Sequence, residues 1–300
     1  MEQRLRYVSE LVEPFRVAPG RTVELRRHYD SGDTGGLASK AEAAARLSEG
    51  ITLLLDYQDR LSAQDTFGVL VVLQGLDAAG KDSTIKHVMS GLNPQGVEVR
   101  SFKQPSREEL KRDFLWRYQQ GLPERSRIGI FNRSHYEEVL VVRVHPELLA
   151  AERIPDPARQ GGVWERRYRE INGWEHHLVD NGIRVVKVFL NLSKPEQAKR
   201  FLRRIDDPAK NWKFSPSDIN ERRYWDQYQK AFDDMLSHTS TRWAPWFVVP
   251  ADHKWFTRLA TAAVLVSVLA EIDPQYPRVD PEVRREMALA RAALLRQIRR

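Results

Sequence analysis

Residues 69–83 read VLVVLQGLDAAGKDS, and this stretch determines the fold. Its apolar β-formers predict a strand over 68–74 that is buried on both faces. A glycine-rich turn follows, and a helix is predicted from about residue 81 to 91. Such a turn directs backbone N–H groups into one concavity, to which the helix N-terminus adds partial positive charge. The spacing G-x-x-x-x-G-K therefore predicts a phosphate-binding loop, made of Gly75, Ala78, Ala79, Gly80, Lys81, Asp82 and Ser83.

Two carboxylates lie in this loop, although it is suited to polyanions. The position after Lys81, where Ser or Thr is usual, is Asp82, and Asp77 lies inside the turn. Because a carboxylate repels phosphate unless a cation separates them, Asp77 is interpreted as a ligand of Mg²⁺, which takes carboxylate and phosphate oxygens. Ser83 is a second candidate. The alternative is that Asp82, or less simply Asp77, caps the following helix, and Lys81 could be a solvated surface lysine.

The composition is typical of a protein with a hydrophobic core and an anionic partner. The chain has 300 residues, 41% of them hydrophobic, a formal net charge of +7 and no cysteine, which excludes disulfides and thiolate sites. The basic balance suggests nucleic acid, anionic lipid or a phosphorylated substrate, or only a charged surface. The longest apolar run, 259–270, is shorter than the roughly 20 residues that span a bilayer. We expect a cytoplasmic protein without a signal peptide or a membrane partner.

Strand and helix patterns alternate along the chain. Further strands are predicted over 97–102, 127–131, 183–192 and 246–250. This alternation predicts an α/β fold, a doubly wound, mostly parallel sheet with helices on both faces. In such sheets ligands bind beyond the carboxyl ends of the strands. The motifs described below follow strands.

Helical periodicity fills most of the remaining chain. Residues 39–64 place Leu47, Ile51, Leu54, Leu55, Gln58 and Leu61 on one face. A helix is predicted over 106–120, with Ser106 and Glu109 as a capping box. The sequence also predicts helices through 135–144, 162–182, from 193 and over 253–271. Residues 1–38 are expected to be an N-terminal arm, and 278–300 a helix with Ala and Leu on one side and Arg on the other.

A second cluster, FNRSHYEE at 131–138, leaves the third strand. Arg133 can bind a phosphate through two parallel hydrogen bonds. Glu137 can bind a metal or a nucleotide, although acids also favour the first turn of a helix. His135 could accept phosphate covalently, but a lone histidine is more often structural. Lys103, beyond the second strand, is a candidate contact to the acceptor phosphate.

A third cluster, at about 199–230, follows the fourth strand and is dense in basic residues. Its two prolines interrupt the helix, which restarts near Asp218. A basic helical hairpin opposite a phosphate loop indicates a lid that excludes water and neutralises charge during phosphoryl transfer. A solvated helix face is the alternative. The cations are Lys199, Arg200, Arg203, Arg204, Lys210 and Lys213.

These motifs together resemble the polyphosphate kinase 2 family. The matching stretches are GLDAAGKDS, NPQGVEVRSFKQPS, FNRSHYEEVLVVRV and DDPAKNWKFSPSDINERRYWDQYQKAF, in order and at matching separations. The resemblance covers roughly 12–277, and 278–300 lies outside it. It implies a P-loop kinase-like, three-layer α/β/α domain over 39–277, similar to thymidylate kinase, with a helical lid.

The resemblance also implies roles for single residues. Asp77 matches the loop aspartate associated with magnesium and catalysis, and Lys81 the phosphate lysine. Arg133 matches the arginine of the second motif, Arg204 the lid arginine at the transferring phosphate, and Asp218 the lid acid beyond it. Lys210 and Lys213 resemble, less directly, positions that line the polyphosphate path.

Asn132 departs from the pattern of family members specialised for diphosphates, which show Asp before the arginine. The form NRSHYE resembles the branch that accepts monophosphates, some members of which also accept diphosphates. Glu137 then substitutes as a metal carboxylate, and Asn132 is expected near the nucleotide with Lys103.

The resemblance implies Mg²⁺-dependent, in-line transfer of phosphate between inorganic polyphosphate and AMP, ADP or ATP, without a covalent intermediate. It also implies a homodimer or homotetramer. Two alternatives remain. One is an ATP-dependent nucleoside monophosphate kinase of the same fold, against which the extended basic lid argues. The other is a nucleic-acid-binding protein with a degenerate loop, against which Lys81 with Asp77 argues, so no nucleic-acid partner is expected.

Overall fold

The computed structural model describes residues 2–159 and 161–298. Its centre is one five-stranded sheet in which every neighbouring pair is parallel. The strand order is β2-β3-β1-β4-β5. The strands are β1 (Gly68–Gln74), β2 (Val97–Ser101), β3 (Ile128–Asn132), β4 (Ile183–Asn191) and β5 (Trp246–Pro250). The five predicted strands and the α/β fold class are confirmed, and the sheet is wholly parallel.

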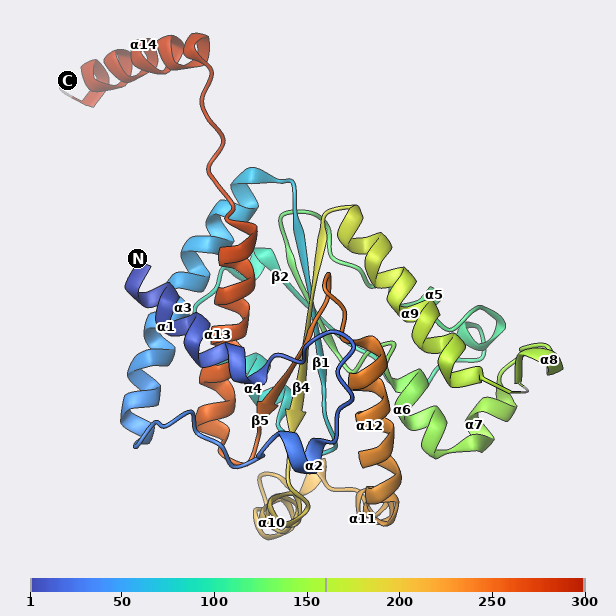
Figure 1. Cartoon of the computed structure of the whole chain (residues 1–300). Coiled ribbons are helices and arrows are strands. Elements are labelled where there is room, and N and C mark those ends of the chain that lie inside the picture. The colour runs from blue at the N-terminus through green and yellow to red at the C-terminus, as the bar shows by residue number, and fades with distance from the viewer. Residues whose placement is uncertain (1, 160, 299–300) are drawn as a thin grey trace.

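Helices cover both faces of the sheet (Figure 1). On one face α1, α3, α4 and α13 pack on the sheet, and on the other α6, α9 and α12. The helices are α1 (Glu2–Val12), α2 (Leu25–His28), α3 (Lys40–Gln64), α4 (Lys81–Val88), α5 (Trp116–Gln119), α6 (Glu137–Val144), α7 (Pro146–Ala151), α8 (Asp156–Arg159), α9 (Val163–Asp180), α10 (Lys194–Asp206), α11 (Pro216–Glu221), α12 (Trp225–Thr239), α13 (Lys254–Ile272) and α14 (Pro281–Ile298).

Strand β1 contributes to both cores because its side chains alternate between the two faces. Val71 packs in the core beneath α3 and α13, and Leu70 in the core beneath α6, α9 and α12. Val71 pairs in register with Ile130 of β3 and Val186 of β4. The near-continuous apolar run of β1 is therefore the sequence signature of a central strand buried on both faces.

The chain reverses its direction across the sheet at β1. From β1 it moves outward to β2 and returns to β3, and β4 and β5 then extend the other side. This arrangement makes the carboxyl ends of β1, β3 and β4 neighbours at the switch point where ligands of such sheets bind. The loops after Gln74, Asn132 and Asn191 are therefore brought to one edge.

Helix α13 is the one candidate membrane span found within 2–159 and 161–298, by length and composition alone. In the structure, 67% of its apolar window is buried, and it packs against α3, α1 and α4. It is therefore the apolar core helix that the sequence predicts over 253–271.

Two expected elements differ in the structure. The single helix expected over 106–120 is split into a 3-10 turn, η3 (Glu109–Lys111), and α5. The Ser106–Glu109 capping box does form. The helix stops because the side chain of Asp113 accepts a hydrogen bond from Leu115 N at 3.0 Å, an Asx turn that competes with helix continuation.

The N-terminal segment has more structure than the expected arm. It begins with helix α1, whose Val8, Leu11 and Val12 are buried against α13. Residue Arg16 then bridges to Phe247 of β5 in antiparallel fashion. The charged character of residues 2–12 concealed the narrow apolar stripe that makes this contact. The proposed domain boundaries at 38 and 277 remain predictions.

Candidate active site

The phosphate-binding loop joins β1 to α4 through backbone conformations that few residues adopt. Gly80, the N-cap of α4, has φ 107°, and Ala78 has φ 64°. A Cβ on Gly75 would lie 3.0 Å from the carbonyl oxygen of Leu190 on β4. Glycine at 75 therefore allows the loop to lie against the neighbouring strand, and glycine at 80 allows the turn into the helix.

Lys81 folds back over this loop. Its Nζ donates to the carbonyl oxygen of Gly75 and, at 3.4 Å, to that of Leu76. Burial lowers the pKa of Lys81, and the nearby Asp77 carboxylate partly opposes the shift. The lysine is thus held at the loop rather than extended into solvent, which contradicts the alternative of a solvated surface lysine. Its charge lies where the predicted phosphates would bind.

Arg133 lies between two of the predicted metal ligands. It follows β3 with φ 65°, and its guanidinium is 2.9 Å from the carboxylate of Asp77 and 4.0 Å from that of Glu137. The three side chains come from the ends of β1 and β3 and the start of α6. The second-motif arginine and the two acids therefore form one charged cluster.

Asn132 and Asp82 form a second contact between the same two loops. Asn132 Nδ2 donates to Asp82 Oδ1 at 2.7 Å. The cap position of α4 belongs to Gly80, which provides no side-chain cap hydrogen bond. Asp82 lies in the first turn of the helix, where its charge favours the N-terminus, and its recorded side-chain partner is Asn132 rather than the backbone.

The lid helices contribute an acid and an arginine. Arg204 of α10 pairs with Asp218 of α11 at 3.4 Å. Burial, followed by the negative charge of Asp77, raises the pKa of Asp218. A small cavity of about 60 Å³ is lined by Asp77, Lys81, Arg133, Glu137 and Asp218, among others. The structure thus brings five of the predicted residues together, with Arg204 attached through Asp218.

The two lysines of the predicted polyphosphate path lie apart from this cluster. Lys210 pairs with Asp207 within the lid, and the Lys213 ammonium lies 4.9 Å from the ring centroid of exposed Trp212. Neither lines the small cavity or the larger one beside it. Both lie on the short segment around η4 (Asn211–Lys213) between α10 and α11.

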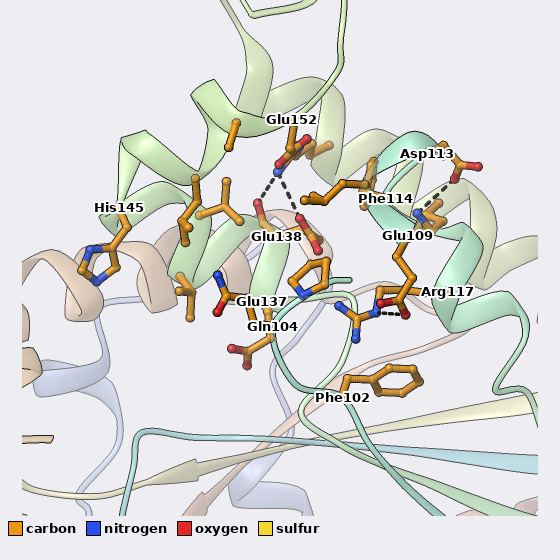
Figure 2. Close-up of a pocket in the computed structure, with 18 of the residues that line it drawn as sticks. Phe102, Gln104, Glu109, Asp113, Phe114, Arg117, Glu137, Glu138, His145 and Glu152 are labelled. Carbon is orange, nitrogen blue, oxygen red and sulfur yellow. Dashed lines mark hydrogen bonds and ion pairs between the residues drawn. The ribbon is translucent and has the colours of Figure 1, made fainter. Parts of the chain in front are cut away.

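A larger cavity of about 960 Å³ adjoins the cluster and shares Asp77, Arg133 and Glu137 with it. Lys103 also lines this cavity, so the structure places this predicted residue beside the charged cluster. Figure 2 shows Phe102 and Arg117 on one side of the cavity and Glu138 and Glu152 on the other.

The sequence analysis did not identify Glu138 and Arg167 as cavity residues. Arg167 of α9 is 3% exposed and lies 2.5 Å from a carboxylate oxygen of Glu152 and 3.6 Å from one of Glu138. Burial raises the pKa of Glu138 to about 7, against the effect of Arg167. The helical pattern of α9 indicated a core face but gave no signal that its arginine bridges two acids from other elements.

Arg200 has a different role from the other lid cations with which the sequence grouped it. It is 4% exposed and donates to the carbonyl oxygens of Ala78 and Ala79 at 3.0 and 2.8 Å. Gln197, one turn earlier, donates to the carbonyl oxygen of Asp77 at 2.9 Å. Arg200 and Gln197 therefore support the phosphate-binding loop through three of its carbonyl oxygens.

His135 is fully buried, at 0% exposure. Its Nε2 lies 3.2 Å from the carboxylate of Glu175, and burial lowers its pKa. A side chain enclosed in this way cannot receive a phosphoryl group from the cavity. The structural interpretation of this histidine therefore holds over the covalent one.

The charged cluster can accommodate a cation only together with substrate oxygens. Within residues 2–159 and 161–298, no group of three or more His, Asp or Glu side chains is arranged to hold a metal ion. Asp77 and Glu137 nevertheless line one cavity, and Mg²⁺ usually takes one or two carboxylates plus phosphates. Burial, followed by the charge of Asp77, raises the pKa of Asp218, and a cation near these acids would favour their charged forms.

The chain is similar to known proteins over most of its length. The family model described as "Polyphosphate kinase 2 (PPK2)" matches residues 37–277. An ADP-polyphosphate phosphotransferase from Rhodopseudomonas palustris is 48% identical over 94% of this chain and 98% of its own length. An AMP/ADP-polyphosphate phosphotransferase from Meiothermus ruber is 42% identical over 89% of this chain and 96% of its own.

A solved structure has the same fold over most of the chain. The crystal structure of polyphosphate kinase 2 from Arthrobacter aurescens TC1 superposes with a TM-score of 0.83 at 39% identity and covers 93% of this chain and 95% of that one. With the family model spanning the sheet, the phosphate-binding loop and the lid, the resemblance read from the motifs is confirmed. The chain belongs to the polyphosphate kinase 2 family.

Proposed function

We propose that this protein transfers phosphate between inorganic polyphosphate and nucleoside mono- or diphosphates, converting AMP to ADP and ADP to ATP. The single observation that supports it most is the junction of the two cavities. Asp77 of the phosphate-binding loop and Arg133 and Glu137 of the second motif line both the small cavity and the larger one. The proposal also draws on the relatives named as AMP/ADP- and ADP-polyphosphate phosphotransferases.

In this proposal the two substrates meet at Arg133. The acceptor nucleotide occupies the larger cavity, with its phosphates directed to Lys103 and Arg133, which line it. Asn132, next to Arg133 in the chain, contributes to the same nucleotide site. The polyphosphate chain lies along the phosphate-binding loop and Lys81 and continues past the lid toward Lys210 and Lys213. In-line transfer between the two needs positioning and charge neutralisation rather than a covalent group.

The acids of the cluster would hold a divalent cation, Mg²⁺, with Asp77 and Glu137 as its protein ligands. Bound there, the cation would neutralise charge on the donor and acceptor oxygens. Arg133 is paired with both acids and would exchange these contacts for phosphate oxygens when substrate binds. Arg204, held by Asp218, would reach the transferring phosphate as the lid closes. It lies on α10 one turn beyond Arg200, which contacts the phosphate-binding loop.

The remaining parts of the proposal concern the setting of the reaction. We infer a cytoplasmic protein that acts as a homodimer or homotetramer, with polyphosphate rather than nucleic acid as its polyanion. The net charge of +7 attracts a linear polyanion with an affinity that decreases as salt is added.

Phosphate transfer by the purified protein tests the proposal. AMP and ADP are offered separately with Mg²⁺ and long-chain polyphosphate, and the products are separated by chromatography. We expect ADP from AMP and ATP from ADP, and a loss of at least about 100-fold in Asp77→Asn, because the variant removes a charge that acts on the transferring group.

Glu10→Gln is the control, because this carboxylate is exposed and pairs with Arg6 on α1. Transfer from ATP to AMP without any transfer from polyphosphate would refute the proposal in favour of an ATP-dependent nucleotide kinase. Binding of RNA or DNA without turnover would instead indicate a nucleic-acid-binding protein.

A further inference from the structure

The three residues after Arg133 are enclosed completely. Ser134, His135 and Tyr136 are each 0% exposed. Ser134 Oγ accepts a hydrogen bond from Gln74 Nε2, at the end of β1, at 3.0 Å. The chain therefore passes within one residue from an arginine at the cavity to a segment fixed inside the protein.

Beneath this segment lies an ion pair without solvent contact. Lys187 in the middle of β4 and Glu175 on α9 are both 0% exposed, and their charged atoms are 2.6 Å apart. Lys187 Nζ also donates to the hydroxyl of Tyr136 at 2.9 Å and to the carbonyl oxygen of Thr239 at 2.6 Å. The ammonium group thus has three hydrogen-bond acceptors, which uses all of its donors.

The carboxylate of Glu175 carries the connection to the arginine loop. It accepts from Tyr136 Oη at 2.7 Å and lies 3.2 Å from His135 Nε2. We refer to Lys187, Glu175, His135 and Tyr136 as the buried clamp, which ties β4 and α9 to the loop after β3.

Stability alone gives a weak reason for this arrangement. A buried ion pair must offset the desolvation of two charges, and replacing such pairs by apolar residues is often neutral or stabilising. Lys187 interrupts the apolar strand β4, in which the flanking Val186 and Val188 are buried. Several buried hydrogen bonds are thus concentrated on residues 134–136. Apolar side chains could have filled the same space.

The residue next to the clamp has an unfavourable backbone conformation. Arg133 has φ 65°, a region that is unfavourable for a non-glycine residue and persists only where the surroundings fix it. Its N–H is 3.4 Å from the carbonyl oxygen of Leu73, a long hydrogen bond. The fixed surroundings are therefore on its carboxyl side, where Lys187 and Glu175 hold His135 and Tyr136.

We propose that the buried clamp fixes the backbone of Arg133 and so directs its guanidinium toward the phosphate cavity. Its members are positioning residues, since none of them touches the cavity cluster. The inference rests on the proposed function in one respect, that Arg133 acts in phosphoryl transfer. It adds that the accuracy of this contact depends on charges buried on the far side of the loop.

The test uses the double variant Lys187→Met with Glu175→Gln, which removes both charges and so leaves neither one buried without its partner. We expect its midpoint of urea unfolding to stay close to that of the wild type, since paired replacement is often near neutral. We expect kcat to fall by roughly 10- to 100-fold with a smaller change in KM, because a small misplacement of a catalytic group has an effect of this size.

A second ion pair on the same strand provides the control. Arg184 and Glu271 pair at the opposite end of β4, away from the cavities. The double variant Arg184→Met with Glu271→Gln should keep the kcat of the wild type. If both double variants lowered kcat alike, the effect would belong to β4 in general, and the inference would be overturned.

A double-mutant cycle then tests whether the clamp acts through Arg133. Arg133→Lys is combined with the clamp variant, and groups that act as a unit give non-additive losses. We expect the combined loss of kcat to be close to that of Arg133→Lys alone. Fully additive losses, or wild-type kcat in a folded clamp variant, would overturn the inference.

Failure of the proposed function would look different. In that case the wild-type protein itself would not transfer phosphate from polyphosphate. If the clamp double variant does not fold, Tyr136→Phe provides the second variant, since it removes only the hydroxyl that joins Lys187 to Glu175. It is expected to lower kcat by a smaller factor, and unchanged kcat in this folded variant would count against the clamp.

Discussion

Glu196 shows how a single residue supports the phosphate-binding loop without facing it. Its carboxylate is 3.0 Å from Arg200 Nε and 2.7 Å from an Arg203 nitrogen. Arg200 in turn donates to the loop carbonyl oxygens. Burial acts to raise the pKa of Glu196, but hydrogen bonds and the charges of the two arginines outweigh it, so the pKa lies below its usual 4.5.

This lowered pKa predicts a loss of stability in acid. A carboxyl group with a depressed pKa in the folded state contributes stability above the unfolded-state pKa, and this is lost as the pH falls through the folded-state pKa. We expect Glu196→Gln to be less stable than the wild type at pH 6, with a difference in the free energy of unfolding that shrinks toward pH 3.5. Urea unfolding at several pH values measures it.

Glu10→Gln is the matched control, because Glu10 and Arg6 form a largely exposed i,i+4 pair on α1. Such pairs contribute little to stability, so this difference should stay near zero across the pH range. A Glu196→Gln difference that does not change with pH would contradict the role of the arginines.

At the scale of single residues, the sequence was sufficient to predict candidates but not their partners. The strand ends predicted that Asp77, Lys81 and Arg133 would meet at one edge, and the structure places them in one cavity. That Arg133 pairs with Asp77, or that Lys187 has a buried partner, depends on how distant segments pack. The sequence places Lys187 in the middle of a predicted apolar strand, but it does not show which acidic residue pairs with it.

At the scale of elements, the apolar face that the sequence predicts for helix α3 differs from the face that the structure buries. The expected apolar face included Leu54, Gln58 and Leu61, which are buried, and also Leu55, which is 37% exposed. The structure buries Leu53 and Tyr57 instead. Adjacent leucines point about 100° apart on a helix of 3.6 residues per turn, so the sequence alone could not decide which of them faces the core.

The two leucines make a matched pair for stability. Leu54→Ala removes a side chain of 0% exposure, and we expect it to lower the free energy of unfolding by about 2–5 kcal/mol. Leu55→Ala should lower it by less than about 1 kcal/mol, because little apolar surface leaves contact. Urea unfolding of both variants measures the two losses, and equal losses would show that the α3 face is assigned wrongly.

At the scale of the whole molecule, the two terminal helices differ in their relation to the body. Helix α1 packs on α13 through buried Val8, Leu11 and Val12. Helix α14 projects away from the body, at the end opposite α10 and α11 (Figure 1). Its residues are exposed throughout, including Met287 and Leu294. The boundary near 277 stays a prediction.

Because α14 is separate and α1 is packed, the two truncations are expected to differ in their effect on stability. A chain ending at Pro277 should keep the kcat of the full chain and its free energy of unfolding to within about 0.5 kcal/mol, since surface changes rarely exceed this. A chain beginning at Glu13 exposes the α13 surface that Val8, Leu11 and Val12 cover, and each buried aliphatic side chain contributes roughly 1.5–3 kcal/mol. It should therefore lose several kcal/mol.

Urea unfolding and the mass in solution, measured on both truncated chains at one protein concentration, separate the two roles. An isolated helix of the length of α14 is only marginally stable in water. Packing its apolar side chains against a partner would stabilise it. If the proposed homo-oligomer uses α14, removal of 278–300 will lower the number of chains in the particle, as calculated from its mass in solution, and leave kcat unchanged. A C-terminal truncation that lowers stability as much as loss of α1 would show instead that α14 folds back onto its own chain.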